Sequence, residues 1–112
     1  VCSSDLIQPH QGLVIFGGGD PMGNFGGARV VTASTQGLGL NNKGDKVTFT
    51  CAGVVINEME YTEGLGGSDQ SVTRQADGDP RSSFVKHSQV NPTLLYSPGT
   101  CVDGLPFSVC LY

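Results

Sequence analysis

The stretch LGLNNKGDKVTFTCAGVVINEMEY, residues 38–61, carries the clearest secondary-structure signal in the chain. From Val47 to Cys51 apolar residues alternate with threonines, a period of two that is typical of a strand with one buried face. Residues 53–61 have the composition of a returning strand, and Cys-Ala-Gly lies between the two runs. The sequence therefore predicts a β-hairpin here.

Four further runs also have the composition of short strands. They are apolar or β-branched and are bounded by glycine, proline or polar turn residues. No window shows the sustained 3.6-residue apolar spacing of an amphipathic helix. About six short strands separated by turns predict an all-β fold, in the form of an antiparallel β-sandwich. The four runs are Leu13–Phe16, Ala28–Ser34, Gln70–Arg74 and Phe84–Ser88.

The composition agrees with a single β-rich domain. A chain of 112 residues is long enough for one modest hydrophobic core. Hydrophobic residues make up 38% and charged residues 14%, which is too apolar and too weakly charged for a disordered tail. The 17 glycines predict many tight turns, as in β-rich rather than helical folds.

The charge distribution argues against two classes of partner. The formal net charge is −4 and the six Lys and Arg residues are scattered, so no basic patch is available for phosphate groups. No apolar run approaches the ~20 residues of a membrane span, and no cluster of basic residues suits acidic lipid. We therefore expect neither nucleic-acid binding nor a membrane span.

The first residues, VCSSDL, match the translation of the common sequencing-adapter stretch GTG TGC TCT TCC GAT CT. We interpret residues 1–6 as a sequence-assembly artefact and residues 7–112 as a domain truncated at its start. A genuine leader is the alternative, but the segment lacks the charged and apolar regions of a signal peptide. Without Cys2, the even total of four cysteines no longer indicates a disulfide framework.

No motif predicts a catalytic, cofactor-binding or metal site. The glycine-rich residues 16–27 lack the spacing of phosphate-binding loops and precede a β-branched run, so they are interpreted as a connection between two strands. His10 and His87 have no partner residues at the spacing of zinc ligands. Ser68 fits a G-x-S-x-G motif only in part, because Gln70 stands in the last position.

Two groups of residues leave alternatives open. Asp77 and Asp79 could bind calcium, but the loop pattern with a closing Glu is absent, and a polar turn with Asx hydrogen bonds explains them at least as well. Cys51 is expected to be a free cysteine on the core face of its strand. Cys101 and Cys110 could pair if the protein is extracellular.

Several motifs follow one another in a fixed order along the chain. A glycine-rich loop after residues 13–16 leads to GLGLNNKGDKV, and QSVTR, FVKHS and SPGTCVDGLPF come next. This succession, from Leu13 to Phe107, resembles bacterial lamin-tail domains. The positions that match the family pattern are Gly37, Leu38, Leu40, Asn41, Asn42, Gly44, Asp45, Val47, Gln70, Ser71, Arg74, Ser97, Pro98 and Gly99.

The resemblance implies an immunoglobulin-like β-sandwich. Family members usually begin with strands that carry an E-[WY]-I-E-L-x-N segment, which this chain lacks, so we expect its first strands to be missing. Within that fold Asn41, Asn42, Gly44 and Asp45 would form a turn, and Arg74 would pair with Asp45. The side chains expected in the core are Leu38, Leu40, Val47, Phe49, Val55 and Tyr61.

The resemblance also implies a function. It suggests a non-catalytic accessory, binding or structural module of a larger secreted or surface bacterial protein, because such domains commonly occur beside secreted nucleases and phosphoesterases. The alternative is the C-terminal module of a secreted hydrolase whose catalytic domain is absent from this chain. We expect an extracellular or cell-surface location, an unknown protein or surface ligand as partner, and tethering to other domains. Nucleic-acid binding, as nuclear lamin tails suggest, is opposed by the acidic net charge.

Overall fold

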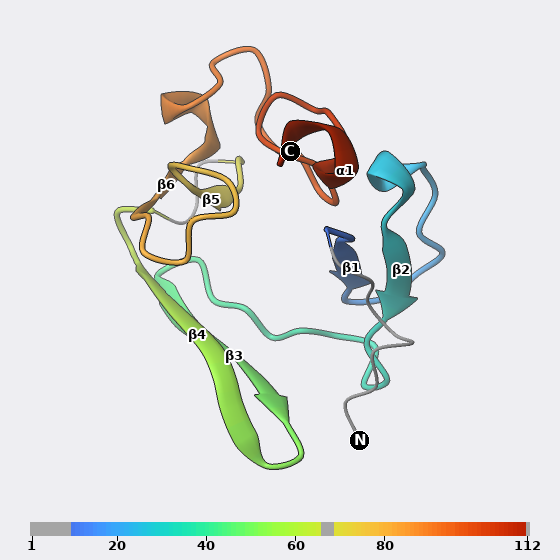
Figure 1. The fold of residues 1–112 in the computed structure, drawn as a ribbon. Helices are drawn as coiled ribbons and strands as arrows, with labels where there is room; N and C mark the ends of the chain where they lie inside the picture. The colour runs from blue at the N-terminus through green and yellow to red at the C-terminus, as the bar shows by residue number, and fades with distance from the viewer. Residues whose placement is uncertain (1–9, 66–68, 112) are drawn as a thin grey trace.

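The computed structural model describes residues 10–65 and 69–111 of the chain. The adapter-like segment at residues 1–6 and the serine of the incomplete motif, Ser68, lie outside the described residues. The described part forms six strands and one short α-helix, so the prediction of a mainly β fold is confirmed. The elements are β1 (Leu13–Phe16), η1 (Phe25–Gly27), β2 (Arg29–Thr32), β3 (Gly44–Cys51), β4 (Val54–Thr62), β5 (Val72–Arg74), β6 (Phe84–Lys86), η2 (His87–Gln89) and α1 (Phe107–Cys110) (Figure 1).

The predicted hairpin is the antiparallel pair of β3 and β4, in which Cys51 lies opposite Val54. Its two turn residues, Ala52 and Gly53, have φ values of 51° and 81°. Left-handed backbone at both central positions is characteristic of the type I′ turn, whose twist matches that of the flanking strands. The pairing register shifts between Phe49 and Thr50, which is a β-bulge in the hairpin.

The pair formed by β1 and β2 corrects the expectation of a wholly antiparallel sheet, because these two strands are parallel. Parallel strands cannot be joined by a tight turn and need a crossover of about a dozen residues or more. The glycine-rich residues 17–28 supply this connection and include η1. The interpretation of this stretch as a link between two strands is confirmed, and the link is a crossover loop.

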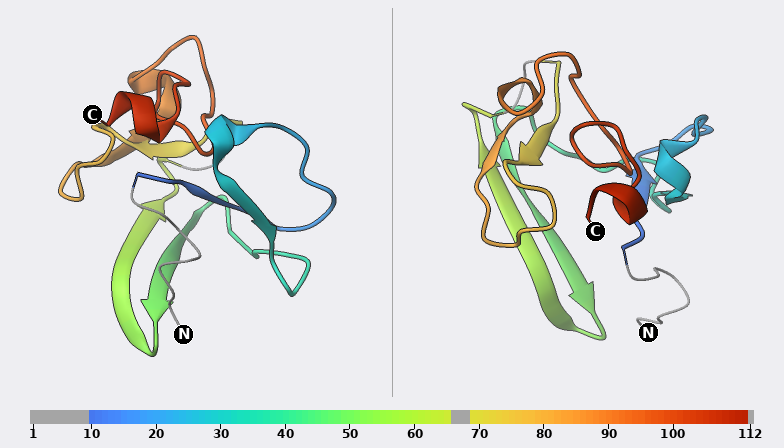
Figure 2. Two further views of the ribbon diagram at one scale, coloured as in Figure 1. Left: turned by 45° about the vertical axis from the view of Figure 1, so that its right-hand side comes forward. Right: turned by 45° about the horizontal axis from the view of Figure 1, so that its top comes forward.

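The prediction that side chains of the hairpin, and of the leucine pair that precedes it, form a buried core is wrong. The leucine pair and the hairpin side chains lie between 43% and 56% exposed, and Tyr61 is only half-buried. The reason is that β3 and β4 pair with each other alone, and the hairpin tip lies away from the other labelled elements (Figure 1). Figure 2 shows the hairpin from two further sides. The exposed members of the predicted core are Leu38, Leu40, Val47, Phe49 and Val55.

Few side chains of the described structure are fully buried. Among the described residues only Cys101 and His87 are fully buried. The three two-stranded sheets, β1–β2, β3–β4 and β5–β6, do not join into a larger one, so many strand edges remain without a neighbour.

A close approach between two loops holds the crossover in place. Ser97 to Thr100 form a turn in which the Thr100 N–H donates to the Ser97 carbonyl at 3.2 Å. Proline at the second position and Gly99, with φ of 79°, at the third are typical of a type II turn. A Cβ on Gly99 would overlap the Phe25 carbonyl oxygen and lie 2.9 Å from the Ala28 Cβ. Only glycine therefore fits both the turn and the contact with η1.

Replacing Gly99 by Ala tests this close approach. We expect the Gly99→Ala variant to lose about 2–4 kcal/mol of unfolding free energy, because left-handed backbone and overlap with η1 both penalise the Cβ. Gly39→Ala is the matched control, since Gly39 also has positive φ, 65°, but a Cβ added there would meet nothing within 4 Å. That control should lose about 1 kcal/mol. Urea denaturation measures both, and equal losses would contradict the contact.

A disulfide joins the segment after this turn to α1. Cys101 and Cys110 are bonded, with Cα atoms 6.4 Å apart, so the pairing considered at the sequence level is confirmed. Cys51 is disulfide-bonded as well, so the prediction that it is a free core cysteine is wrong. Cys51 is the last residue of β3, beside the hairpin turn, and is partly buried.

Replacing Cys101 and Cys110 together by Ser should lower the unfolding free energy by about 2–3 kcal/mol. The cross-link spans a sequence separation of 9, and closing a loop of that size removes a corresponding amount of chain entropy from the unfolded state. Urea denaturation of the variant and the parent without reductant measures the loss. Alkylation of either thiol in the folded, unreduced parent would contradict the bond.

Candidate functional site

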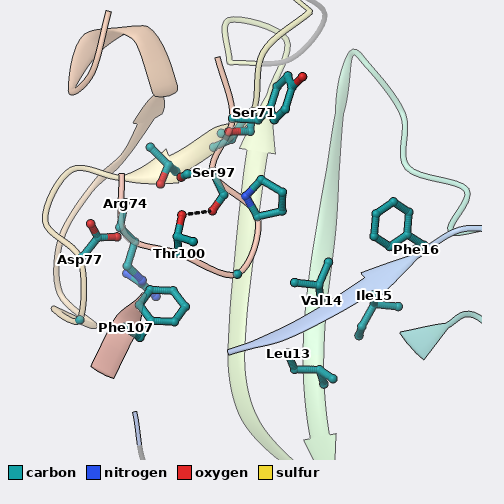
Figure 3. Close-up of a pocket in the computed structure, with 16 residues that line it drawn as sticks. Leu13, Val14, Ile15, Phe16, Ser71, Arg74, Asp77, Ser97, Thr100 and Phe107 are labelled. Carbon is teal, nitrogen blue, oxygen red and sulfur yellow. Dashed lines mark hydrogen bonds between the residues drawn. The ribbon is translucent and has the colours of Figure 1, made fainter. Parts of the chain in front are cut away.

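A cleft of the described structure lies between β1 and the C-terminal part of the chain (Figure 3). Its volume is about 610 Å³. All four residues of β1 form one wall, and β5 with the Ser97–Thr100 turn forms the opposite one. Phe107, the first residue of α1, closes one end. The lining is mostly apolar, which is usual for binding clefts.

Several polar groups of this cleft are engaged within the chain. The Thr100 hydroxyl contacts the Ser97 carbonyl at 3.2 Å, drawn as a dashed line in Figure 3, and the Cys101 carbonyl at 2.9 Å. The Asp77 carboxylate accepts from the Val102 N–H at 2.8 Å. These contacts tie together loops that are distant in sequence, so the polar groups stabilise the walls of the cleft.

Arg74 corrects the predicted ion pair with Asp45. Its Nη1 donates to the carbonyls of Pro80 and Ser82, both at 3.1 Å, and its guanidinium lies 4.5 Å from the centre of the Phe84 ring. Arg74 lies on β5, whereas Asp45 lies on β3 of another sheet, where it accepts from nearby backbone N–H groups. In the described structure Arg74 therefore holds the loop that joins β5 to β6.

His87 forms the most buried polar contact of the described residues. Its side chain is 0% exposed. Nδ1 lies 3.0 Å from the Leu94 carbonyl oxygen, and Nε2 lies 2.8 Å from Ser97 Oγ. Because a carbonyl oxygen can only accept, we assign the ring proton to Nδ1, and in the neutral ring Nε2 then accepts from the Ser97 hydroxyl. The imidazole thus connects η2 to two positions of the loop that follows it.

Two residues of the QSVTR motif hold the backbone around His87. Gln70 Oε1 accepts from the Ser88 N–H at 2.8 Å, and the Ser71 carbonyl accepts from the His87 N–H at 3.0 Å. Together with Ser97, they place three motif positions around one histidine. Sequence reasoning does not reveal this role of His87, although FVKHS belongs to the resemblance, because a lone histidine carries no pattern that shows what surrounds it.

The Ser97 and His87 pair has the spacing of a catalytic nucleophile and its general base. A general base must also reach the substrate and return its proton to a leaving group. The His87 ring is completely buried, and both of its nitrogens are engaged within the chain. The arrangement therefore suits a structural bridge better than acyl transfer.

The motif around residues 38–45 lies away from the cleft. Asn41 begins a turn in which its carbonyl accepts from the Gly44 N–H at 3.2 Å and its side chain accepts from the Lys43 N–H at 2.9 Å. The Tyr61 hydroxyl also donates to the Asn41 carbonyl, at 2.7 Å. The predicted turn is confirmed. The motif positions that do not line the cleft are Gly37, Leu38, Leu40, Asn41, Asn42, Gly44, Asp45, Val47 and Gln70, whereas Ser71, Arg74, Ser97, Pro98 and Gly99 line it.

The acidic residues weighed as metal ligands have other roles. Asp79 accepts from the Arg81 N–H at 2.9 Å, which is the expected Asx contact, and Asp77 binds the Val102 N–H. Among the described residues, Cys101, Asp103 and Cys110 bring together side chains of metal-binding type. The two sulfur atoms are bonded to each other, so neither is a thiolate that could hold zinc.

Comparisons with known proteins identify no relative. A scan against models of known protein families finds no match, and searches of curated proteins and of solved structures find none either. The resemblance to bacterial lamin-tail domains therefore stays a prediction that rests on the sequence motifs. Within the described residues, no helix has the length and apolar character to traverse a bilayer.

Replacing His87 by Ala should destabilise the protein strongly. We expect a loss of about 3 kcal/mol, because the variant leaves a cavity and a Leu94 carbonyl without its partner. Ser97→Ala removes one hydrogen bond and should cost about 1 kcal/mol. Ser34→Ala, at an exposed serine, is the control and should change stability by less than about 0.5 kcal/mol. Thermal unfolding that gives similar values for all three variants would contradict the bridge.

Proposed function

We propose that this chain is a non-catalytic binding or structural module of a larger secreted or surface bacterial protein. One observation carries the proposal: the cleft presents apolar side chains and strand backbone, while the Thr100 hydroxyl and the Asp77 carboxylate bond within the chain. Such a surface can recognise a partner by shape and backbone hydrogen bonds. It offers few free acids, bases or nucleophiles for chemistry.

The proposal includes an extracellular location. Cys101 and Cys110 form a disulfide. Disulfides persist in oxidising compartments and are rare in the reducing cytosol. A small domain with few buried side chains also gains more from such cross-links than a domain with a large core. The cysteine bonding thus supports secretion or surface display.

The proposal also includes kinship with lamin-tail domains and an immunoglobulin-like sandwich. Its support is that the matching positions have defined structural roles. Gln70, Ser71 and Ser97 surround His87, and Pro98 and Gly99 form a turn packed on η1.

The proposed partner is a protein or another surface ligand. The net charge of −4 disfavours the phosphate backbone of nucleic acids. The exposed side chains of the described residues include many large apolar ones, among them Ile15, Val54 and Ile56. Exposed apolar side chains are common at the sites where proteins bind partners.

Hydrolysis assays on the Ser97→Ala variant test the non-catalytic assignment. The parent and the variant are incubated with p-nitrophenyl acetate and with bis(p-nitrophenyl) phosphate. We expect equal, background-level rates, because buried His87 cannot exchange protons with a bound ester. Ser34→Ala controls for the preparation. Turnover by the parent that falls with Ser97→Ala, but not with Ser34→Ala, would overturn the proposal in favour of a serine hydrolase.

A further inference from the structure

The edge of β1 that faces away from β2 has unpaired backbone groups. In the parallel ladder, the Gly12 carbonyl accepts from the Arg29 N–H, and the Phe16 carbonyl accepts from the Ala33 N–H. Backbone groups alternate between the two edges of a strand, so the even-numbered residues of β1 face β2. The N–H and C=O groups of Leu13 and Ile15 therefore point to the opposite side. β1 has no second strand neighbour there among the described residues.

This free edge borders the cleft. All four β1 residues line it, and no residue of β2 does, so the cleft lies on the side of β1 away from β2. β5 lines the opposite wall and is also an edge strand. The His87 N–H donates to the Ser71 carbonyl, and the Gln75 N–H donates to the Ser83 carbonyl, so the odd-numbered positions of this pair face β6. The backbone groups of Val72 and Arg74 are then left on the outer edge of β5.

We propose that this cleft binds an extended peptide strand with alternating apolar side chains, which adds to the free edge of β1. The inference rests on the proposed binding function and names its class of partner. An extended backbone is the ligand that supplies donors and acceptors at the spacing of Leu13 and Ile15. Side chains of β1 project alternately to its two sides, as Val14 and Ile15 do in Figure 3, and the apolar lining receives alternate side chains of the peptide.

The β3–β4 hairpin also has free edges, but it carries the charges that protect edges from pairing. Lys46 Nζ lies 3.3 Å from Glu58 Oε1 on the neighbouring strand, and Asp45 and Glu60 are charged as well. Charged residues on edge strands discourage the addition of another strand. β1, with the sequence LVIF, has no charged residue. The chain therefore leaves β1 as its unprotected edge.

Binding of a synthetic peptide to the full 112-residue chain tests the proposal. The probe is a fluorescein-labelled octapeptide of alternating Val and Thr, and fluorescence anisotropy follows its binding. We expect saturable binding that weakens about tenfold or more when alternate peptide nitrogens are N-methylated. Methylation keeps the side chains but removes the donors of one edge. Each of the two methylated peptides carries methyl groups on one edge only, and the one methylated on the edge that faces β1 should bind more weakly. Equal binding of all three peptides would overturn the proposal.

Two matched protein variants locate the binding site. Ile15→Lys places a charge on the proposed edge, and Val55→Lys places one on the hairpin; the parent side chains are 49% and 56% exposed. We expect Ile15→Lys to weaken peptide binding about tenfold or more and Val55→Lys to leave it unchanged. Circular dichroism checks that both variants unfold at the temperature of the parent. Should Ile15→Lys fail this check, Ile15→Thr, which keeps the β-branched shape, takes its place and should weaken binding in the same direction.

Other outcomes would assign the cleft differently. Parent-like binding by Ile15→Lys would place the peptide elsewhere and overturn the proposal. A dimer of the parent in sedimentation that Ile15→Lys dissociates would show that a second copy of the chain occupies the cleft, and would also overturn the proposal. If the parent neither binds the peptide nor hydrolyses the esters, only this inference is overturned. If the parent binds the peptide and also shows ester turnover that depends on Ser97, only the non-catalytic function is overturned.

Discussion

The His87 imidazole holds together the part of the molecule that follows the hairpin. Its ring contacts the Leu94 carbonyl and the Ser97 hydroxyl, and the backbone N–H of His87 donates to the Ser71 carbonyl. In a chain with so few buried side chains, the desolvation of this ring is offset only because both of its nitrogens have partners. Since Ser97 opens the turn that packs on η1, the same ring sets the position of one wall of the cleft.

The second constraint is the lack of a closed core. Three two-stranded sheets cannot cover one another, and isolated strand pairs are marginally stable in water. The protein compensates with specific contacts between loops: the Cys101–Cys110 bond, the Asp77 contact with Val102, and the glycine-dependent contact of the Ser97–Thr100 turn with η1. These contacts hold β1 and β5 on the two sides of the cleft while their outer edges remain free. The same loop contacts therefore stabilise the walls of the cleft and leave the outer edges of β1 and β5 free.

Local features of the fold could be predicted because they depend on neighbouring residues. The hairpin turn needs left-handed backbone at two positions, and Gly53 and the short Ala52 meet that need. The alternation in β3 and the β-branched runs of β2 and β5 correctly place strands. The candidate site was predictable only in part: the motif residues Ser71, Arg74 and Ser97 line the cleft, but no sequence pattern indicates that His87 joins two of them or that Arg74 binds loop carbonyls instead of Asp45.

By itself, the sequence determined where strands and turns occur, because backbone preference and side-chain alternation act over a few residues. Only the tertiary structure decided which faces are covered. Alternation in β3 shows that Val47 and Phe49 share a face, but how far another sheet covers that face depends on distant segments, and both side chains stay partly exposed. The parallel pairing of β1 with β2 and the burial of His87 are likewise decided by contacts between residues far apart in the chain. The entropy lost in forming such contacts depends on the length of chain between them, so no short stretch of sequence shows it.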